Sequence, residues 1–500
     1  LASIELIRVQ RGAGDMVALG IPVWVAMLVM PAGFTFMGLR LIRRAGERWP
    51  SRVMAVAGLL IPIVMYGFPD LQGYGMLIPG LVVLIAATLF GMPIFATIGG
   101  LALLLFWNDG IPLASVPVET YRLTASPMLP AVPLFTLGGY ILSEGGASKR
   151  VTRLFTALFG WMPGGLAIVT VLVLAFFTPL TGASGITILS MGGLLLPVLM
   201  RARYPEGTSI GLVTVSGSIG LLLPPSLPVI LYAVTARNAS ILDLFIGGLV
   251  PGILLIVLVA AWGVRQGLLI GKKRTPFDRR EALAAIGEAR WELLLPIVIL
   301  AGIFTGFTTL VEAAAVTVGY AVAIECFVHR ELTLRRDMAR IGVECATMVG
   351  GFMIILGMAL GLTNYLIDAE VPMHALALAQ QYIESPWVFL LALNLFLLVV
   401  GGLMDIYSAI FVVVPLITPI AAAYGIHPVH LGIIFLANLE LGYLTPPMGE
   451  NLFLAAYRFD RPLSVVFRAT FPLWVILLGA VQLNTYVTAL TLTLVRLVGN

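Results

Sequence analysis

The 500-residue chain carries too little charge for a soluble protein. Hydrophobic residues make up 60% of it and charged residues only 11%, where a soluble domain carries about a quarter. Apolar runs close to the length of a bilayer crossing recur throughout, and we expect roughly a dozen membrane segments. The net charge of +4 does not indicate nucleic acid as a partner, because Lys and Arg are confined to short spacers between apolar runs, as in cytoplasmic loops.

The first predicted span covers residues 17–41 and follows a polar stretch, not the charged start of a signal peptide. Because the chain begins with Leu1, we interpret it as a fragment or a processed product. We place the loop after this span in the cytoplasm, because Lys and Arg resist translocation. The basic residues that mark this loop are Arg40, Arg43, Arg44, Arg48 and Arg52.

Alternating crossings follow from that assignment. Residues 54–68 lead out, 76–90 return, and 94–107 lead out again if the chain turns at Gly91–Pro93. The polar segment 108–127 is then an external loop. The next span, 128–142, returns to the basic residues Lys149, Arg150 and Arg153.

The first half of the remaining chain contains a predicted helical hairpin. Between Arg153 and Arg201 the chain must leave the cytoplasmic side and return, with its break at residues 181–185. An interrupted span then leads out near Arg237, and another returns to a basic loop at 272–280. Two shorter helices, broken around 305–309, end at the basic residues Arg330, Arg335, Arg336 and Arg340.

The second half contains a hairpin of the opposite sense. No Lys or Arg occurs between Ile341 and Tyr457, and we place the connection marked by Asp368, Glu370 and Glu384 outside. A hairpin over 387–423, broken at Gly401 and Gly402, therefore starts and finishes outside. The span 431–457 ends inside at Arg458 and Arg461, and the last helix, 463–490 or beyond, leaves the C-terminus outside.

Two short motifs relate the halves. Residues 220–226 (GLLLPPS) match 442–448 (GYLTPPM), and each motif follows a hairpin break at a similar distance. Gly182 precedes Pro224 by 42 residues (224 − 182), and Gly402 precedes Pro446 by 44 (446 − 402). We therefore predict an all-α polytopic membrane protein with an inverted-topology repeat, its halves at about 128–265 and 291–458.

Each Pro-Pro pair predicts an ion site inside a span. Proline supplies no amide and cannot continue a helix, so nearby carbonyls lose their partners, which is tolerable where unwound backbone lines a cavity and binds a cation. The predicted cation ligands are Thr181, Gly182, Ser184, Gly220, Gly401, Gly402, Asp405, Thr445 and Pro446. The predicted substrate contacts are Thr187, Ser226 and Gly449.

Asp405 is the leading candidate, because a carboxylate deep in a span is rare and usually functional. The alternative for Asp405 is that it lies at a turn and reaches water. The alternative for the predicted hydroxyl ligands is ordinary hydrogen bonding between helices. We expect structural roles for three other embedded acids, Glu312, Glu440 and Glu450, with Glu312 as a helix cap.

The sequence lacks the residue patterns expected of disulfide-bonded, metal-binding, ATP-binding and enzymatic proteins. Cys326 and Cys345 suggest no disulfide framework and read as small apolar residues. His427 and His430 flank a short turn without the clustering of a metal site, and we interpret them as loop histidines. The sequence has no GxxxxGK[ST] motif for ATP and no nucleophile–base pair within the spans. We therefore predict a transporter without a cofactor, not an enzyme.

From about residue 76 to 490 the chain resembles DctM, the large permease subunit of tripartite ATP-independent periplasmic (TRAP) transporters. The first-half motifs that carry the resemblance are 129–135 (LPAVPLF), 163–165 (PGG), 177–187, 224–226 (PPS) and 251–252 (PG). Those of the second half are 302–312, 401–405 (GGLMD) and 444–449 (LTPPMG). Residues 1–48 resemble the last helix of the small subunit, DctQ, which suggests a fusion whose front is missing. The implied division is 1–48, a connecting span 49–75, and a large permease domain 76–496.

The resemblance implies an elevator-type importer of the bacterial inner membrane, driven by sodium. Its partners would be a periplasmic substrate-binding protein, the small subunit and an organic anion. One departure is that the family's common Ser-Gly-Ser-Ser hairpin motif reads Thr181-Gly182-Ala183-Ser184 here, so Ala183 removes a hydroxyl. The alternative is a stand-alone sodium- or proton-coupled symporter that needs no binding protein. The particular organic acid does not follow from the sequence.

Overall fold

The computed structural model describes residues 2–13, 16, 22–44, 76–89, 92–124, 129–270, 276–446 and 449–498. The predicted connecting segment 49–75, with its span 54–68, lies outside the described residues. So do Arg48, residues 272–274 of the basic loop, and Pro447 and Met448 of the second Pro-Pro motif. The described residues form two compact units, one of 1–126 with 351–371 and one of 127–350 with 372–500.

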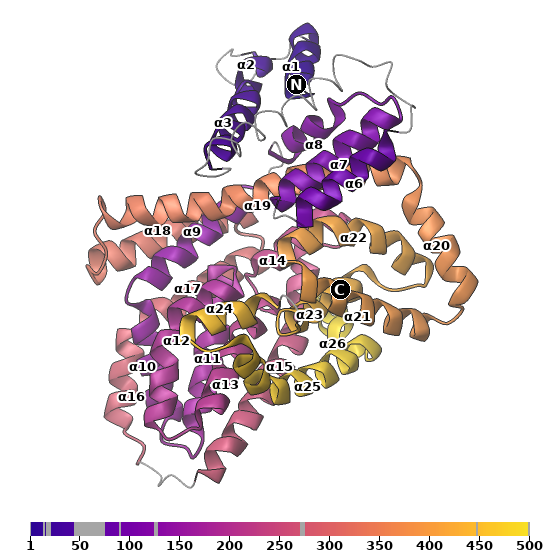
Figure 1. Ribbon diagram of the computed structural model, residues 1–500. Coiled ribbons are helices and arrows are strands. Elements are labelled where there is room, and N and C mark those ends of the chain that lie inside the picture. The colour runs from indigo at the N-terminus through magenta and orange to yellow at the C-terminus, as the bar shows by residue number, and fades with distance from the viewer. Residues whose placement is uncertain are drawn as a thin grey trace. The chain divides into compact units, whose positions relative to one another are not determined.

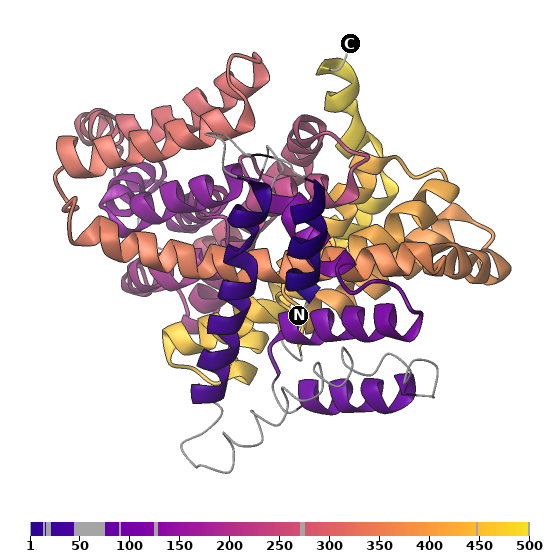
Figure 2. The same cartoon turned by 90° about the horizontal axis from the view of Figure 1, so that it is seen from above.

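Unit 1 is a small group of helices. They are α1 (Ala2–Ala13), α2 (Val23–Met27), α3 (Val29–Arg44), α6 (Leu77–Leu89), α7 (Ile94–Asn108), α8 (Ser115–Thr124) and the second part of α19 (Asp337–Asp368). Helix α19 appears in Figure 2 as one long orange helix.

The prediction of a loop over 108–127 is wrong, because α8 lies within it. Val116 is buried against Gly361 of α19, and Val118 and Tyr121 pack against a small core that includes Leu6 and Met27. The polar residues of this segment, which suggested a loop, belong to an amphipathic helix with one apolar face.

Unit 2 holds both predicted hairpins. Its first helices are α9 (Ala131–Glu144), α10 (Ala147–Phe159), α11 (Gly165–Thr181), α12 (Ser184–Arg201), α13 (Glu206–Ile219), η3 (Gly220–Leu222), α14 (Leu227–Ala236) and α15 (Ile241–Leu269). The connecting helices are α16 (Arg279–Glu288), α17 (Arg290–Phe304), α18 (Leu310–Val322), η4 (Ala323–Val328), the start of α19, and α20 (Val371–Tyr382). The last are α21 (Pro386–Leu403), α22 (Ile406–Ala423), α23 (Pro428–Gly442), α24 (Glu450–Phe459), α25 (Leu463–Tyr486) and α26 (Ala489–Val498) (Figure 1).

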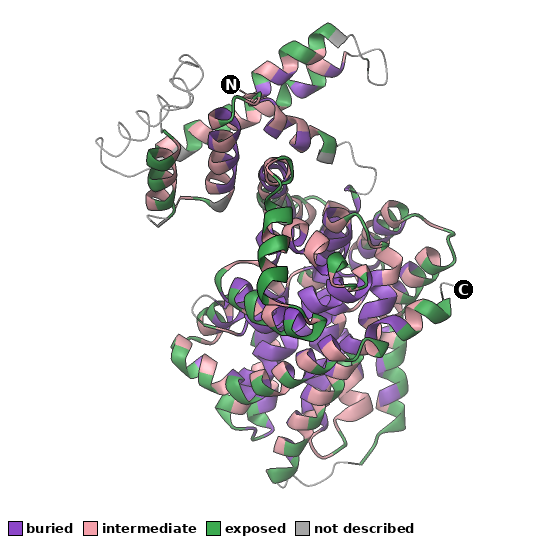
Figure 3. Cartoon of the chain, turned by 90° about the vertical axis from the view of Figure 1, so that its right-hand side faces the viewer, coloured by how far each residue is buried: buried purple, intermediate pink, exposed green. Residues whose placement is uncertain are grey.

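The lengths and hydropathy of these helices match a polytopic membrane protein. Among the described residues, eight helices are long and apolar enough to cross a bilayer. The count is nine if the pair Glu206–Leu222 and Leu227–Ala236, bent by 44°, is one interrupted span, as predicted. Five shorter apolar helices bring the total near the dozen segments expected. On α21, Val388, Leu391, Leu395 and Val399 form an exposed apolar stripe, which suits contact with lipid. Figure 3 shows buried residues gathered in the interior of the body that ends at the C-terminus.

Two boundaries in the second half differ from their predictions. Helix α21 continues through Gly401 and Gly402, and the break falls at Met404 and Asp405. The glycines lie inside the helix and serve a different purpose, which is to let α21 cross α23 closely. A Cβ on Gly442 would lie 2.5 Å from the Cα of Gly401. The last predicted helix, 463–490, is likewise two helices, which part at Val487 and Thr488.

A buried ionic network joins α10 to the connecting helices. The Arg150 side chain is 4% exposed, and its guanidinium lies 2.6 Å from a carboxylate oxygen of Glu292 on α17 and 2.5 Å from one of Glu325 in η4. A third carboxylate, that of Glu331, lies 3.1 Å away and is half-exposed. The backbone amide of Gly146 also donates to Glu325, at 3.2 Å. One arginine therefore stabilises two carboxylates that are cut off from water.

We predict that Arg150→Gln lowers the free energy of unfolding by about 3–5 kcal/mol, because removing one partner leaves buried charges uncompensated. The matched control is Arg153→Gln on the same helix. Arg153 is exposed and pairs with the exposed Glu281 and Glu288, so its loss should change stability much less. Thermal unfolding of the purified variants in detergent measures both effects. Equal losses for the two variants would contradict the assignment.

Candidate functional site

Four helices of unit 2 begin beside an unwound segment, and these segments form the candidate site. Helices α12 and α14 begin after breaks in the first half, and α22 and α24 after breaks in the second. The first four amides of a helix have no partner inside that helix. Each break therefore exposes both unpaired carbonyls and a helix N-terminus that favours negative charge.

The tip of the first hairpin is the two-residue link between α11 and α12. Gly182 adopts the left-handed conformation (φ 73°) that ends α11, which few residues other than glycine accept readily. The hydroxyls of Thr181 and Thr187 lie 2.8 Å apart, and both residues are fully buried. Ala183 is the N-cap of α12 and supplies no side-chain cap. The predicted break at 181–185 is therefore confirmed.

The first broken helix lies against this hairpin. A Cβ on Gly220 would lie 2.7 Å from the Thr178 side chain, and one on Gly182 would lie 3.1 Å from that of Leu227. Ser226 is the N-cap of α14, yet its hydroxyl makes no capping bond and has no hydrogen-bond partner among the described residues, although the residue is fully buried. A buried hydroxyl without a partner is costly, which marks Ser226 as a place for a missing polar group.

The second hairpin and the second broken helix meet in the same way. A Cβ on Gly402 would lie 3.4 Å from the carbonyl oxygen of Thr445 and 3.5 Å from that of Pro446. A Cβ on Gly449 would lie 2.7 Å from the carbonyl oxygen of Tyr443 and 2.8 Å from that of Thr445. Glycine thus brings backbone close to three carbonyl oxygens of the unwound segment. The Thr445 hydroxyl itself donates to Leu441 and accepts from the Trp474 indole.

Two carboxylates lie at the second pair of helix starts. Asp405 caps α22 and accepts hydrogen bonds from the amide and the hydroxyl of Ser408, at 3.0 and 2.6 Å. Glu450 is the first residue of α24 and is exposed, and one of its carboxylate oxygens would lie 3.7 Å from a Cβ on Gly185 in the first turn of α12. By sequence, neither half of the site contains Lys or Arg between 154 and 200, 204 and 236, or 341 and 457. The arrangement favours a bound cation over a side-chain counter-ion.

Hydrogen bonds connect the two halves. The Tyr407 hydroxyl, on α22, donates to the carbonyl oxygen of Gly182 at 2.8 Å. The Ser184 hydroxyl, at the start of α12, donates to the side-chain oxygen of Asn451 on α24 at 2.9 Å. Within the second half, the amide of Ile406 donates to the Tyr443 hydroxyl at 2.6 Å. The structure thus brings together residues that the sequence separates by more than 220 positions.

Sequence reasoning missed three of these groups, Tyr407, Tyr443 and Asn451. It also gave Glu450 only a structural role. The signal that could have found these four residues is their position in the sequence, because each lies within seven residues of a predicted ligand. Their partners lie on other helices, which hydropathy does not reveal.

The remaining single residues divide between confirmed and wrong predictions. Glu312 forms a capping box with Thr309, as predicted. Glu440 is buried, and its Oε1 atom has no hydrogen-bond partner among the described residues. The interpretation of His430 as a loop residue is wrong: its ring nitrogens lie 2.8 Å from the Thr491 hydroxyl and 3.1 Å from the Thr485 carbonyl oxygen, because α25 and α26 cover it.

The two halves of the site differ in charge. Helices α12 and α14 begin after Ala183 and Ser226, neither of which supplies a capping carboxylate, although the Glu450 carboxylate lies beside Gly185 in the first turn of α12. Helices α22 and α24 begin at Asp405 and at Gly449 followed by Glu450. The N-termini of α12 and α14 therefore suit a negative charge and the carboxylates at α22 and α24 a positive one, while the unwound carbonyl groups at both pairs of breaks can bind a cation.

Comparison with known proteins identifies relatives across most of the chain. Residues 81–490 match the family described as the DctM component of tripartite ATP-independent periplasmic transporters. A C4-dicarboxylate TRAP transporter large permease protein DctM of Pseudomonas aeruginosa is 34% identical over 406 residues, which cover 80% of this chain and 93% of that protein. The isethionate TRAP transporter permease protein DctMQ of Oleidesulfovibrio alaskensis is 32% identical over 495 residues, 98% of this chain and 78% of that protein.

Two solved structures share the fold. The Alcanivorax borkumensis YdaH transporter superposes with a TM-score of 0.55 at 12% identity, covering 74% of this chain and 86% of that one. Neisseria gonorrhoeae MtrF gives a TM-score of 0.55 at 12% identity, covering 75% and 84%. At this identity the likeness concerns the fold alone.

We predict that Gly442→Ala lowers the free energy of unfolding by about 1–3 kcal/mol, because its Cβ would press on Gly401 and push α21 from α23. Gly479→Ala is the control, since a Cβ there meets no atom within 4 Å and alanine favours the helix. Thermal unfolding in detergent separates the two variants. A neutral Gly442→Ala would show that the crossing is not tight.

Proposed function

Given that the chain belongs to the DctM family of TRAP transporters, we propose that it performs sodium-driven uptake of a small organic anion. Family membership makes it a transporter permease of the bacterial inner membrane and not an enzyme. The resemblance noted from its motifs is confirmed for the large permease. Coupling ion, substrate and transport mechanism are our proposals.

The carboxylate pair at the second-half helix starts is the observation that supports a coupling cation most directly. Asp405 and Glu450 stand at the starts of α22 and α24, and the carbonyl oxygens of Thr445 and Pro446 lie beside Gly402. Oxygen ligands of this kind suit sodium, and discontinuous helices supply them in secondary transporters. We propose second-half sodium ligands at Gly401, Gly402, Asp405, Thr445 and Pro446, and a matching set at Thr181, Gly182, Ser184 and Gly220.

The first-half helix starts support an organic anion. The N-termini of α12 and α14 carry no side-chain cap, and the buried Ser226 hydroxyl has no partner among the described residues. We propose that a substrate carboxylate binds there, with Thr187 and Gly449 lining the same site. The names of three relatives agree in type, since they specify C4-dicarboxylate, isethionate and 2,3-diketo-L-gulonate, all organic anions.

The partners and the mechanism follow the family. We propose that a periplasmic binding protein delivers the substrate, and that 76–496 is the large permease domain. Residues 1–48 would correspond to the end of a small subunit, with 49–75 as the connection. The DctMQ relative, whose match extends over 98% of this chain, supports a fused arrangement. We further propose an inverted repeat whose hairpins carry the substrate across as an elevator, supported by the two hairpin and broken-helix pairs.

We predict that proteoliposomes containing the full chain take up an organic acid only with an inward sodium gradient and the cognate binding protein. The acid is first chosen by thermal-shift screening of that binding protein. Choline chloride replaces sodium chloride as the control. Uptake without the binding protein would favour a stand-alone symporter, and uptake without sodium would refute the sodium sites.

We predict that Asp405→Asn weakens sodium binding about tenfold or more, because losing one charged ligand costs about 1.5–3 kcal/mol. Asparagine still caps a helix, so α22 should keep its start. The measurement is the rise in melting temperature with sodium chloride relative to choline chloride. Asp243→Asn, in the first turn of α15, is the control. A sodium response equal to that of the unmodified chain would exclude Asp405 as a ligand.

A further inference from the structure

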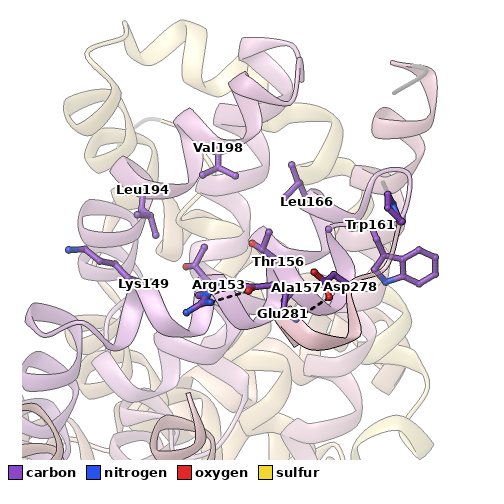
Figure 4. Close-up of a pocket in the computed structure, with 13 residues that line it drawn as sticks. Lys149, Arg153, Thr156, Ala157, Trp161, Leu166, Leu194, Val198, Asp278 and Glu281 are labelled. Atoms are coloured by element: carbon purple, nitrogen blue, oxygen red, sulfur yellow. Dashed lines mark hydrogen bonds and ion pairs between the residues drawn. The ribbon is translucent and has the colours of Figure 1, made fainter. Parts of the chain in front are cut away.

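A pocket away from the helix breaks lies between α10, the open end of the first hairpin and the start of α16 (Figure 4). Its volume is about 550 Å³, within the range of small-molecule sites. Lys149 and Arg153 of α10 and Asp278 and Glu281 of α16 supply its charges, while Leu194 and Val198 of α12 supply part of an apolar wall.

The charges of the pocket are separated. Arg153 is already engaged by Glu281, at 2.8 Å, and by Glu288, and this hydrogen bond lowers the pKa of Glu281 below its usual value. Lys149 is exposed and forms no ion pair among the described residues. Figure 4 shows Lys149 at one side of the pocket and Asp278 at the other, with Arg153 between them. Lys149 thus lacks an ion-pair partner among the described residues at one side of the pocket, while Asp278 at the other side uses only Oδ1 for the capping bonds of α16.

The surroundings place this pocket at a membrane surface. Helices α10 and α16 have 13 and 10 residues, too few to cross a bilayer, and they pack together through Leu154 and Ala285. The rings of Trp161 and Phe277, 38% and 48% exposed, meet edge to face with centroids 5.9 Å apart. Exposed aromatic rings beside basic residues are typical of the cytoplasmic headgroup layer.

We propose that this pocket binds one phospholipid with an ethanolamine headgroup. Its phosphate would bind Lys149 and its primary ammonium Asp278, while an acyl chain would follow the wall of Leu194 and Val198. The lining carries two cations, Lys149 and Arg153, and two carboxylates, Asp278 and Glu281, which matches a zwitterion better than a purely anionic headgroup. The apolar wall distinguishes a lipid from a soluble phosphate. Because the wall belongs to an arm of the first hairpin, the lipid would pack directly against that hairpin.

Native mass spectrometry of the purified full chain with defined lipids tests the proposal. Phosphatidylethanolamine should stay bound more than phosphatidylcholine or phosphatidylglycerol. Lys149→Gln should reduce its retention about tenfold, as expected for one lost charged contact. Arg237→Gln, at an exposed position after α14, is the matched control and should change nothing. Equal retention by Lys149→Gln and the unmodified chain overturns the proposal.

A second variant tests the ammonium contact. Asp278 caps α16 by accepting the amides of Arg280 and Glu281, and asparagine can keep that cap. Asp278→Asn should therefore fold normally and shift preference from phosphatidylethanolamine toward phosphatidylglycerol. An unchanged preference overturns the zwitterion assignment.

Position is checked by fluorescence. Phosphatidylethanolamine with brominated acyl chains should quench Trp161, and Trp161→Phe should remove that part of the quenching. If Trp161→Phe leaves the quenching unchanged, the lipid is not in this pocket. Displacement of the lipid by inorganic phosphate alone would show a soluble-anion site and overturn the proposal as well.

Discussion

A bilayer offers no hydrogen-bond partners to an interrupted helix, and the arrangement of unit 2 follows from that constraint. Its helix breaks are packed against one another, so that the unwound backbone of one break is covered by the helix end of the next. Thr445 and Pro446 lie on Gly402, and the carbonyl oxygen of Gly182 receives the Tyr407 hydroxyl. The Tyr443 hydroxyl accepts the first amide of α22. The breaks are tolerated because groups from one break cover or hydrogen-bond the unwound backbone of another.

Glycine has two different uses in this scheme, and only one of them could be predicted from the sequence. At Gly182 a positive φ ends α11 and opens the hairpin, a local property that the glycine after Thr181 indicates. At Gly401 and Gly402 the same residue type continues a helix and permits a close crossing. The two cases differ in the residue packed against the glycine. Opposite Gly401 this residue is Gly442, which belongs to another helix, α23. The misplaced second break thus came from a contact distant in the sequence.

Composition and charge placement predicted the membrane class, both hairpins and the interrupted span, because each has a signal within about 20 residues of sequence. The groups that connect the halves have no such signal. Asn451 and Tyr407 are single polar residues near helix starts, and their roles depend on Ser184 and Gly182 being brought near by the fold. His430 was misassigned for the same reason, since Thr485 and Thr491 follow it by more than 50 residues.

The ion pairs formed by arginine lie away from the helix breaks, and this separation bears on how cation binding and anion binding are coupled. The ion pairs of Arg150, Arg153, Arg340 and Arg461 lie near the ends of helices that border basic loops, while the site relies on helix N-termini and two carboxylates. On the proposed function, a sodium ion bound at Asp405 offsets the charge of that carboxylate and attracts an anion bound at the N-termini of α12 and α14. Opposite unit charges about 8 Å apart, at an effective dielectric constant of about 20, attract by about 2 kcal/mol. That corresponds to roughly thirtyfold in affinity, so one electrostatic contact between the halves is enough to make anion binding depend on the cation.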